Sequence, residues 1–118
     1  MTQEFVSTTK FDHQWNELGL SDDDRSELEE ILMKNPQAGD VIPGTGGLRK
    51  LRVVQNGKGK RGGGRVLYVA FQRFETIYLM LMYGKNEKTD ATPEEKRIMK
   101  QAIIRLEKEL KQKSAKKK

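Results

Sequence analysis

The sequence contains no cysteine and only one histidine, His13. The first absence excludes disulfides, thiol catalysis and cysteine-ligated zinc. A lone histidine also excludes a multi-histidine metal site and a two-histidine nuclease mechanism within this chain. No apolar run approaches the roughly 18 residues that a transmembrane helix needs, and residues 1–4 lack the basic and apolar parts of a signal peptide. We therefore expect a soluble, cytoplasmic protein with no metal and no other cofactor.

Acidic residues are missing from the middle of the chain. Between Arg49 and Arg65 there are seven basic residues, five glycines and no acidic residue. Residues 1–47 carry ten acidic and three basic residues, whereas residues 48–118 carry twenty basic and seven acidic ones. This asymmetry is typical of a protein that binds a polyanion, most often nucleic acid. A basic loop that is merely solvated would show the same charge pattern.

At 118 residues the chain is long enough for one domain with a modest core. Its first third predicts a short strand at residues 4–8 and then two helices. One helix is capped by Thr9 and ends at Gly19, and its inner face holds Phe11, Trp15 and Leu18. The other begins at Ser21 and ends at Asn35-Pro36, and its inner face holds Leu28, Ile31 and Leu32.

A turn-rich segment, residues 36–47, precedes three predicted strands at 48–54, 65–71 and 76–83. A last helix begins at Thr92-Pro93 and has Met99, Ala102, Ile103, Leu106 and Leu110 on one face. The lysine-rich residues 113–118 predict a disordered basic tail, which leaves residues 1–112 as the folded domain. We predict an α+β fold in which two N-terminal helices and a C-terminal helix pack on a mainly antiparallel four-stranded sheet.

The strand at residues 48–54 carries the first candidate site residues. Because Leu51 and Val53 alternate with Lys50 and Arg52, the two cations share the face opposite the core. Arg65 lies close to them if the next strand is an antiparallel neighbour. The connecting segment would let Lys58, Lys60 and Arg61 reach over the same face. Such a cluster can bind phosphates and stabilise the charge on a phosphodiester that is being cleaved.

Other patterns do not match a nucleotide or metal site. The glycine-rich residues 57–64 lack the Ser or Thr that follows the lysine of a P-loop, and no helix follows them as in a dinucleotide site. The number of glycines there favours a mobile hairpin loop. The adjacent aspartates at 22–24 suit the first turn of a helix better than a metal site.

Three segments carry a family resemblance: residues 44–53 (GTGGLRKLRV), 63–68 (GGRVLY) and 83–87 (YGKNE). With the order of elements and the final Thr92-Pro93 helix, they resemble the RelE/HigB superfamily of bacterial type II toxins, and most closely its HigB-like branch. The resemblance covers nearly the whole chain. It implies a RelE-like fold and a ribosome-dependent mRNA endonuclease, which cuts the message in the A site and so inhibits translation.

The chemistry implied by the resemblance is attack of a ribose 2′-oxygen on the adjacent phosphate, which leaves a cyclic phosphate and a 5′-hydroxyl. The basic catalytic positions of the family then fall on Lys50, Arg52 and Arg65. The family archetype has an arginine where this chain has Asn86, so Lys85 is the candidate to replace it. Tyr83 is the nearest counterpart of the family's late catalytic tyrosine. The candidate nucleic-acid contacts are Arg49, Lys58, Lys60, Arg61 and Asn86.

The resemblance also implies a cognate HigA-like antitoxin with a helix-turn-helix motif. It would block the basic face and repress the shared operon, so that operator DNA is contacted only through the antitoxin. Two alternatives stay open. A ParE-like toxin of the same fold would inhibit DNA gyrase, and a non-catalytic RNA-binding module would bind RNA without turnover.

Overall fold

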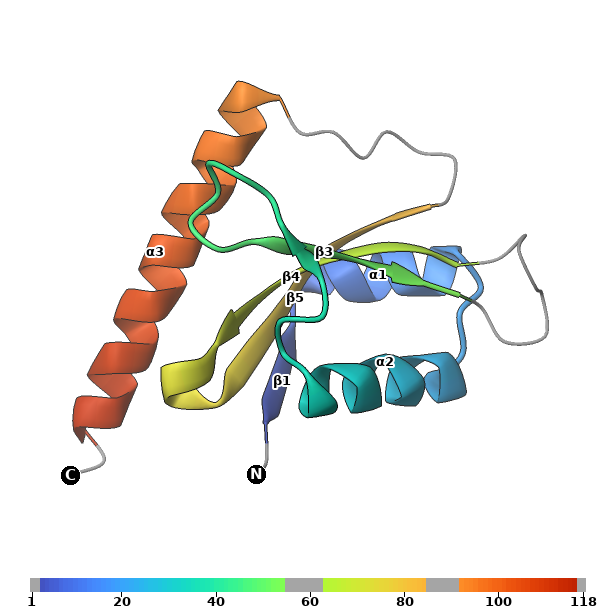
Figure 1. Cartoon of the computed structure of the whole chain (residues 1–118), viewed down its shortest axis with the longest axis horizontal. Helices are drawn as coiled ribbons and strands as arrows, with labels where there is room; N and C mark the ends of the chain where they lie inside the picture. Colours follow the sequence, from blue (N-terminus) through green and yellow to red (C-terminus); the bar gives the residue numbers. More distant parts are fainter. Residues whose placement is uncertain (1–2, 55–62, 85–91, 117–118) are drawn as a thin grey trace.

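The computed structural model describes residues 3–54, 63–84 and 92–116. Along the chain the elements are β1 (Glu4–Ser7), α1 (Thr9–Glu17), α2 (Asp22–Lys34), β2 (Asp40–Val41), β3 (Arg49–Val53), β4 (Gly64–Phe71), the 3-10 turn η2 (Gln72–Phe74), β5 (Thr76–Gly84) and α3 (Pro93–Lys116) (Figure 1). Every helix and strand that the sequence predicts is present. The α+β class is confirmed.

The sheet has five strands in the order β1-β5-β4-β3-β2, one more than the four that we predicted. The additional strand is β2, in which Asp40 pairs with Lys50 and Val41 pairs with Arg49. Two residues are too few to show a period-two pattern, and these two lie in the turn-rich segment. Three of the four strand pairings are antiparallel and only β1 runs parallel to its neighbour β5, so the mainly antiparallel character is confirmed.

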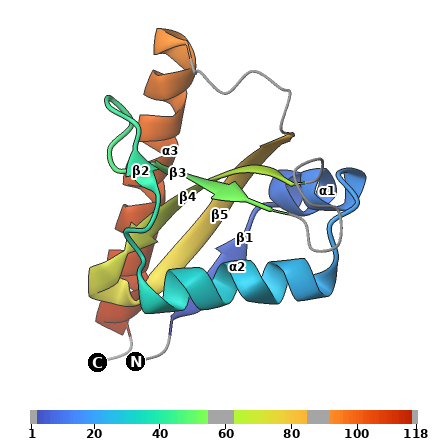
Figure 2. The ribbon, with the colours of Figure 1, turned by 45° about the vertical axis from the view of Figure 1, so that its right-hand side comes forward.

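The helices form a layer on each face of the sheet (Figure 2). Helices α1 and α2 cover one face and contribute Phe11, Trp15, Leu28 and Leu32 to a core that also holds Val66, Tyr68, Ile77, Leu79 and Met82. Helix α3 covers part of the other face and packs Ile103, with Met99, Ala102, Leu106 and Leu110, on Leu48, Leu67, Val69, Phe71 and Met80. We call these the α1/α2 face and the α3 face.

Side-chain caps fix where the three helices begin. The cap of α1 is Thr8, one residue earlier than the predicted Thr9, and its hydroxyl accepts a hydrogen bond from Phe11 N. Ser21 and Asp24 form a reciprocal capping box on α2. Thr92 and Glu95 form another on α3, as the sequence predicts. Both boxes satisfy amide groups that the first turn of a helix leaves unpaired.

Two predictions for the helices are wrong in detail. Ile31 was placed on the inner face of α2, but its side chain is 43% exposed. Helix α3 continues to Lys116, into the segment 113–118 that we expected to be a disordered tail. Lysine, glutamine and alanine favour helix, so the last turns form without apolar anchors. Among the described residues no helix is both long and apolar enough to cross a membrane.

Candidate active site

Arg52, Arg65 and Tyr83 form a row across three neighbouring strands. Arg52 of β3 is the direct partner of Arg65 of β4, and Arg65 is the direct partner of Tyr83 of β5. Directly opposite residues in a sheet place their Cβ atoms about 4.5–5.5 Å apart on the same face. The three side chains therefore leave the sheet on the same face, which is the α3 face because Tyr83 packs there.

Lys50 belongs to the same face, one row further along. It lies two residues before Arg52 and pairs with Leu67, which pairs in turn with Leu81. Leu67 is buried under α3 together with Leu48 and Ile103. The charged rows therefore border the apolar part of the α3 face. The strand register therefore places Lys50, Arg52 and Arg65 on one face, as predicted.

Arg65 is an unusual residue for its position. Strand β4 is the middle strand of the sheet, and all of its residues are buried except Arg65 and Ala70, which are partly exposed. Arg65 is also the only charged residue in β4 or β5. Within the described ranges, the side chains of Arg52 and Arg65 form no hydrogen bond or ion pair. Two like charges directly opposite one another destabilise a sheet, so this pair favours a bound anion.

Two glycines let the backbone close tightly beside the row. A Cβ on Gly64 would lie 2.1 Å from the carbonyl oxygen of Tyr83, and a Cβ on Gly63 would lie 2.0 Å from that of Val53. Gly63 also has a φ of +94°, which disfavours any other residue. Flexibility alone does not explain these two glycines, because a side chain at either position would push the strands of the row apart.

Tyr83 also borders a cavity of about 110 Å³ between the sheet and the first turns of α3. The wall is mainly apolar and includes Leu67, Leu81 and Met99, with Glu95 and Lys96 at the helix. Thr45 is fully buried in the opposite wall, where its hydroxyl donates to Ile42 O at 2.6 Å and accepts from Leu48 N at 3.1 Å. The row therefore adjoins a partly enclosed, weakly polar space.

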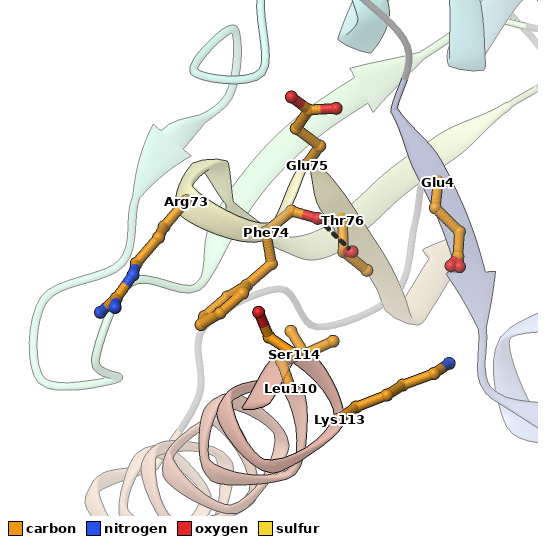
Figure 3. A pocket seen from close by; sticks show the side chains of 8 residues that line it. All are labelled: Glu4, Arg73, Phe74, Glu75, Thr76, Leu110, Lys113 and Ser114. Carbon is orange, nitrogen blue, oxygen red and sulfur yellow. Dashed lines mark hydrogen bonds between the residues drawn. The ribbon is translucent and has the colours of Figure 1, made fainter. Parts of the chain in front are cut away.

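A larger cavity, of about 290 Å³, lies at the other end of β5 (Figure 3). Its wall mixes two acids, Glu4 and Glu75, with two bases, Arg73 and Lys113. The hydroxyl of Thr76 donates to Phe74 O at 2.9 Å. Because its wall carries both acids and bases, this cavity is less suited to a polyanion than the row at the far end of the strand.

Arg49 does not share the face of the other predicted cations. It pairs with Tyr68, which belongs to the core of the α1/α2 face. Its guanidinium donates to Gly39 O at 2.7 Å and to Gln37 O at 3.4 Å. The Tyr68 hydroxyl donates to Pro36 O and accepts from Gly39 N, both at 2.8 Å, and burial raises its pKa. Arg49 thus helps to hold the segment between α2 and β2.

The remaining predicted site residues lie outside the described part of the chain. Lys58, Lys60 and Arg61 fall in residues 55–62, and Lys85 and Asn86 fall in residues 85–91. The strand residues nearest to these segments are Val53, Gly64 and Gly84, which pair across β3, β4 and β5 at the same end of the sheet as the row.

The described residues contain no group of three or more His, Asp or Glu side chains that could hold a metal. Asp24 is used in the capping box instead, and Asp22 and Asp23 complete the first turn of α2. The two arginines can act only electrostatically, because arginine does not titrate. Tyr83 is the one member of the row that can exchange a proton.

A comparison against known families agrees with the fold. A family model described as the RelE toxin of the RelE/RelB toxin–antitoxin system matches residues 7–117. The match covers almost all of the sequence, including every strand from β3 to β5 and helix α3. A RelE toxin implies an antitoxin as its partner. The chain belongs to the RelE toxin family and is the toxin component of a toxin–antitoxin system.

Proposed function

We propose that this toxin is a ribosome-dependent mRNA endonuclease that cuts the message in the A site and so inhibits translation. The observation that carries the proposal is the Arg52–Arg65–Tyr83 row. It places two cations without side-chain partners next to a phenol on the three central strands, at one end of the sheet, at a cost to the stability of the fold. Bound phosphate would offset that cost, which makes an RNA backbone the best-matched substrate.

The reaction follows from the chemistry of RNA. The 2′-oxygen of one nucleotide attacks the adjacent phosphorus, loses its proton, and forms a 2′,3′-cyclic phosphate. The bond to the 5′-oxygen of the next nucleotide breaks, and that oxygen takes up a proton. Arg65 and Arg52 would stabilise the extra negative charge on the phosphoryl oxygens, which is the effect with the largest contribution in such reactions. Lys50 would hold the neighbouring phosphate.

Proton transfer needs a group that can titrate, and the two arginines cannot serve. Tyr83 stands directly beside Arg65, so we assign it the role of protonating the leaving oxygen or of holding it. Lys50 and Lys85 are the other candidates, together with groups of the substrate itself. Lys58, Lys60, Arg61 and Asn86 would contact the RNA backbone outside the reacting phosphate.

The same row suggests how the toxin is kept inactive. We propose that the antitoxin is a HigA-like helix-turn-helix protein that covers Lys50, Arg52 and Arg65 and that alone contacts the operator DNA. Acidic side chains on the antitoxin would satisfy the cations in place of phosphate. A target on the ribosome implies that the toxin acts in the cytoplasm.

Primer extension on translating ribosomes tests the proposal. Wild-type protein should produce cuts within the A-site codon and no cuts in the same message without ribosomes. Arg65→Ala should lower the cleavage rate about 10²- to 10³-fold, since removal of one charge-stabilising donor typically has that effect. Arg105→Ala is a matched control, because Arg105 is an exposed arginine on α3 away from the row.

Circular dichroism must show that Arg65→Ala is folded. A folded Arg65→Ala variant with wild-type cleavage would remove Arg65 from the site. Inhibition of DNA gyrase without RNA cleavage would assign the chain to the ParE-like alternative. Salt-dependent RNA binding without turnover would leave a non-catalytic RNA-binding module.

A further inference from the structure

Strand β5 contains a β-bulge, and the bulge decides which way Tyr83 faces. Tyr68 of β4 pairs with Leu79, but its neighbour Leu67 pairs with Leu81, so Met80 is an extra residue on β5. Met80 and Leu81 consequently both belong to the α3 face, where strict alternation would separate them. A bulge of this kind inserts one unpaired residue and locally bends the strand.

The consequence for the site follows from counting along the strand. Before the bulge, Ile77 and Leu79 face the α1/α2 core, and after it Met82 does. If the same residues alternated strictly from Leu79, with no bulge, Tyr83 would point into the α1/α2 core and Met82 to the α3 face. The bulge therefore brings Tyr83 to the side of the sheet where Arg65 stands.

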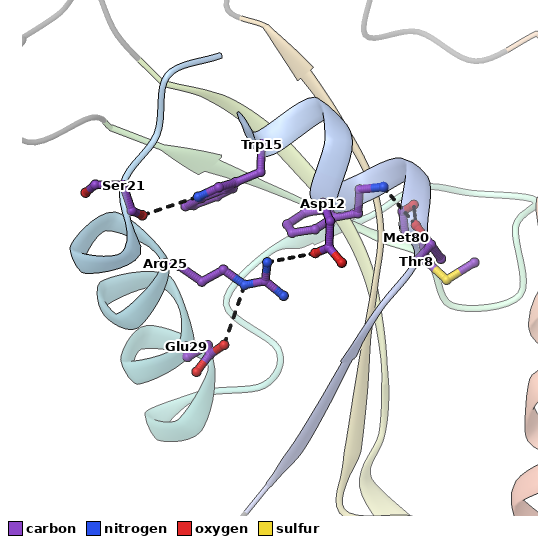
Figure 4. A network of polar contacts seen from close by, with 8 residues as sticks. Thr8, Asp12, Trp15, Ser21, Arg25, Glu29 and Met80 are labelled. Carbon is purple, nitrogen blue, oxygen red and sulfur yellow. Dashed lines mark hydrogen bonds and ion pairs between the residues drawn. The ribbon is translucent and has the colours of Figure 1, made fainter. Parts of the chain in front are cut away.

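The bulge is held by side chains that lie at the start of α1, away from the row. Strand β1 pairs with β5 only as far as Ser7 and Leu79, so the outer edge of β5 loses its strand partner at the bulge. There the Thr8 hydroxyl donates to Met80 O at 2.7 Å (Figure 4). Further along α1, the side-chain oxygen Oε1 of Gln14 accepts from Met82 N at 2.9 Å.

Helix α1 is a rigid support for these two contacts. Phe11 and Trp15, which flank Gln14 on the helix, are buried, and Trp15 Nε1 donates to Ser21 O at 3.3 Å. The guanidinium of Arg25 lies over the Phe11 ring, 5.3 Å from its centre, and donates to Asp12 Oδ1 at 2.8 Å. The position of Gln14 is therefore fixed against both α2 and the sheet.

We propose that Gln14 and Thr8 are positioning residues of the active site: by binding the backbone of Met82 and Met80 they stabilise the bulge that places Tyr83 beside Arg65. The expected effect on cleavage rests on the proposed function. The expected effect on the conformation of β5 is independent of it. Gln14 is the better probe, because the Thr8 hydroxyl also caps α1.

The experiment compares three variants of the full-length chain, each obtained with its antitoxin and then separated from it. Gln14→Ala removes the acceptor for Met82 N. Gln14→Glu keeps an oxygen acceptor at the same place. Asn16→Ala is the matched control, since Asn16 is an exposed amide side chain on the same helix. The measurements are single-turnover cleavage on ribosomes, nuclear Overhauser contacts between the Tyr83 ring and the Arg65 side chain, and hydrogen exchange of the Met82 amide.

For Gln14→Ala we expect faster exchange of the Met82 amide, weaker Tyr83–Arg65 contacts and a cleavage rate constant lower by about tenfold to a hundredfold, as for a misplacement of about 1 Å. The ribosome concentration at half-saturation should not change, because the cations that bind RNA are untouched. Gln14→Glu should recover most of the rate, which loss of stability alone would not predict.

Two results would overturn the inference. If the wild-type protein cuts mRNA and Gln14→Ala cuts as fast as Asn16→Ala, Gln14 does not position the site. If the wild-type protein cuts no mRNA, the proposed function fails, and the Tyr83–Arg65 contacts decide alone. Contacts that are lost in Gln14→Ala and kept in Asn16→Ala then support the inference, and contacts that are equal in both overturn it.

Discussion

The two faces of the sheet each pair an arginine with a tyrosine and use them differently. On the α1/α2 face, Arg49 lies directly opposite Tyr68, and both side chains are bonded to backbone groups of residues 36–39. On the α3 face, Arg65 lies directly opposite Tyr83 and beside Arg52, and all three side chains keep some exposure. Arg49 and Tyr68 are structural, whereas the side chains of Arg52 and Arg65 are available to a ligand.

The difference shows that charge and sequence position do not by themselves identify a site residue. Arg49 and Arg52 lie three residues apart in the same basic segment, yet they point to opposite faces of β3 because side chains alternate along a strand. The internal partners of Arg49 offset the cost of partly burying its charge, whereas the stability of the fold gains nothing visible from Arg52 and Arg65. A function that uses these two arginines accounts for them.

Removal of one oxygen from each tyrosine should separate the two faces most clearly. Tyr68→Phe leaves Pro36 O and Gly39 N without their partner in a buried place, so unfolding in urea should show a loss of about 1–3 kcal/mol. Its cleavage of mRNA should remain normal while it is folded. Tyr83→Phe is the matched variant: we expect cleavage lower by at least about tenfold. Equal effects of the two changes on cleavage would contradict the assignment of the faces.

Arg49→Ala should behave like the structural tyrosine, with a smaller effect. The variant loses the bonds from the guanidinium to Gly39 O and Gln37 O, one of them long, so we expect a loss of about 1 kcal/mol in unfolding free energy. Primer extension should give wild-type cleavage. A stable Arg49→Ala variant that no longer cuts would return Arg49 to the nucleic-acid contacts, where the sequence placed it.

Arg52→Gln should change the stability of the fold in the opposite direction to Arg49→Ala. The change removes one of two like charges that stand directly opposite each other, so the fold should become more stable by up to about 0.5 kcal/mol. The gain should shrink when salt is added, because screening already weakens the repulsion. Cleavage should fall at the same time. A loss of stability in Arg52→Gln would mean that Arg52 has a favourable partner in the folded chain.

Strand alternation allowed part of this site to be predicted. Lys50 and Arg52 were placed on one face because Leu51 and Val53 are apolar, and the register puts Arg65 directly opposite Arg52. The face of Tyr83 was not predictable in the same way. Residues 76–83 are apolar on both sides, so nothing in their pattern marks the extra residue at Met80. A bulge becomes visible only when the partners of its backbone groups are known.

Other parts of the fold escaped the sequence for similar reasons. The pairing of β2 involves only Asp40 and Val41, and a length of two residues carries no periodic signal. The glycines at 63 and 64 looked like general flexibility, because their close approach to Val53 and Tyr83 depends on neighbouring strands. The helix caps at Ser21 and Thr92 were found because each depends on residues within one turn.

The smallest expected effect concerns the paired charges that support α1. Arg25 holds the pKa of Asp12 below its usual value through their hydrogen bond. A lowered pKa in the folded state stabilises the fold above the unfolded-state pKa, and the effect is lost as the pH falls through the folded value. Because 47% of the Asp12 side chain is exposed, Asp12→Asn should cost only about 0.2–1 kcal/mol at pH 7. As the pH falls through the lowered folded-state pKa of Asp12, the variant and the wild type should become equally stable.

Glu17→Gln is the control for Asp12→Asn. Its carboxylate lies 3.2 Å from His13, with both side chains largely exposed, so its loss should not be measurable at pH 7. If Asp12→Asn is as neutral as Glu17→Gln at every pH, the ion pair between α1 and α2 contributes nothing to stability. The packing of Phe11 and Trp15 then holds α1, and with it Gln14 and the bulge, in place. In that case the two faces differ in how exposed their arginines and tyrosines are, and the pairing of charges between α1 and α2 does not contribute to the difference.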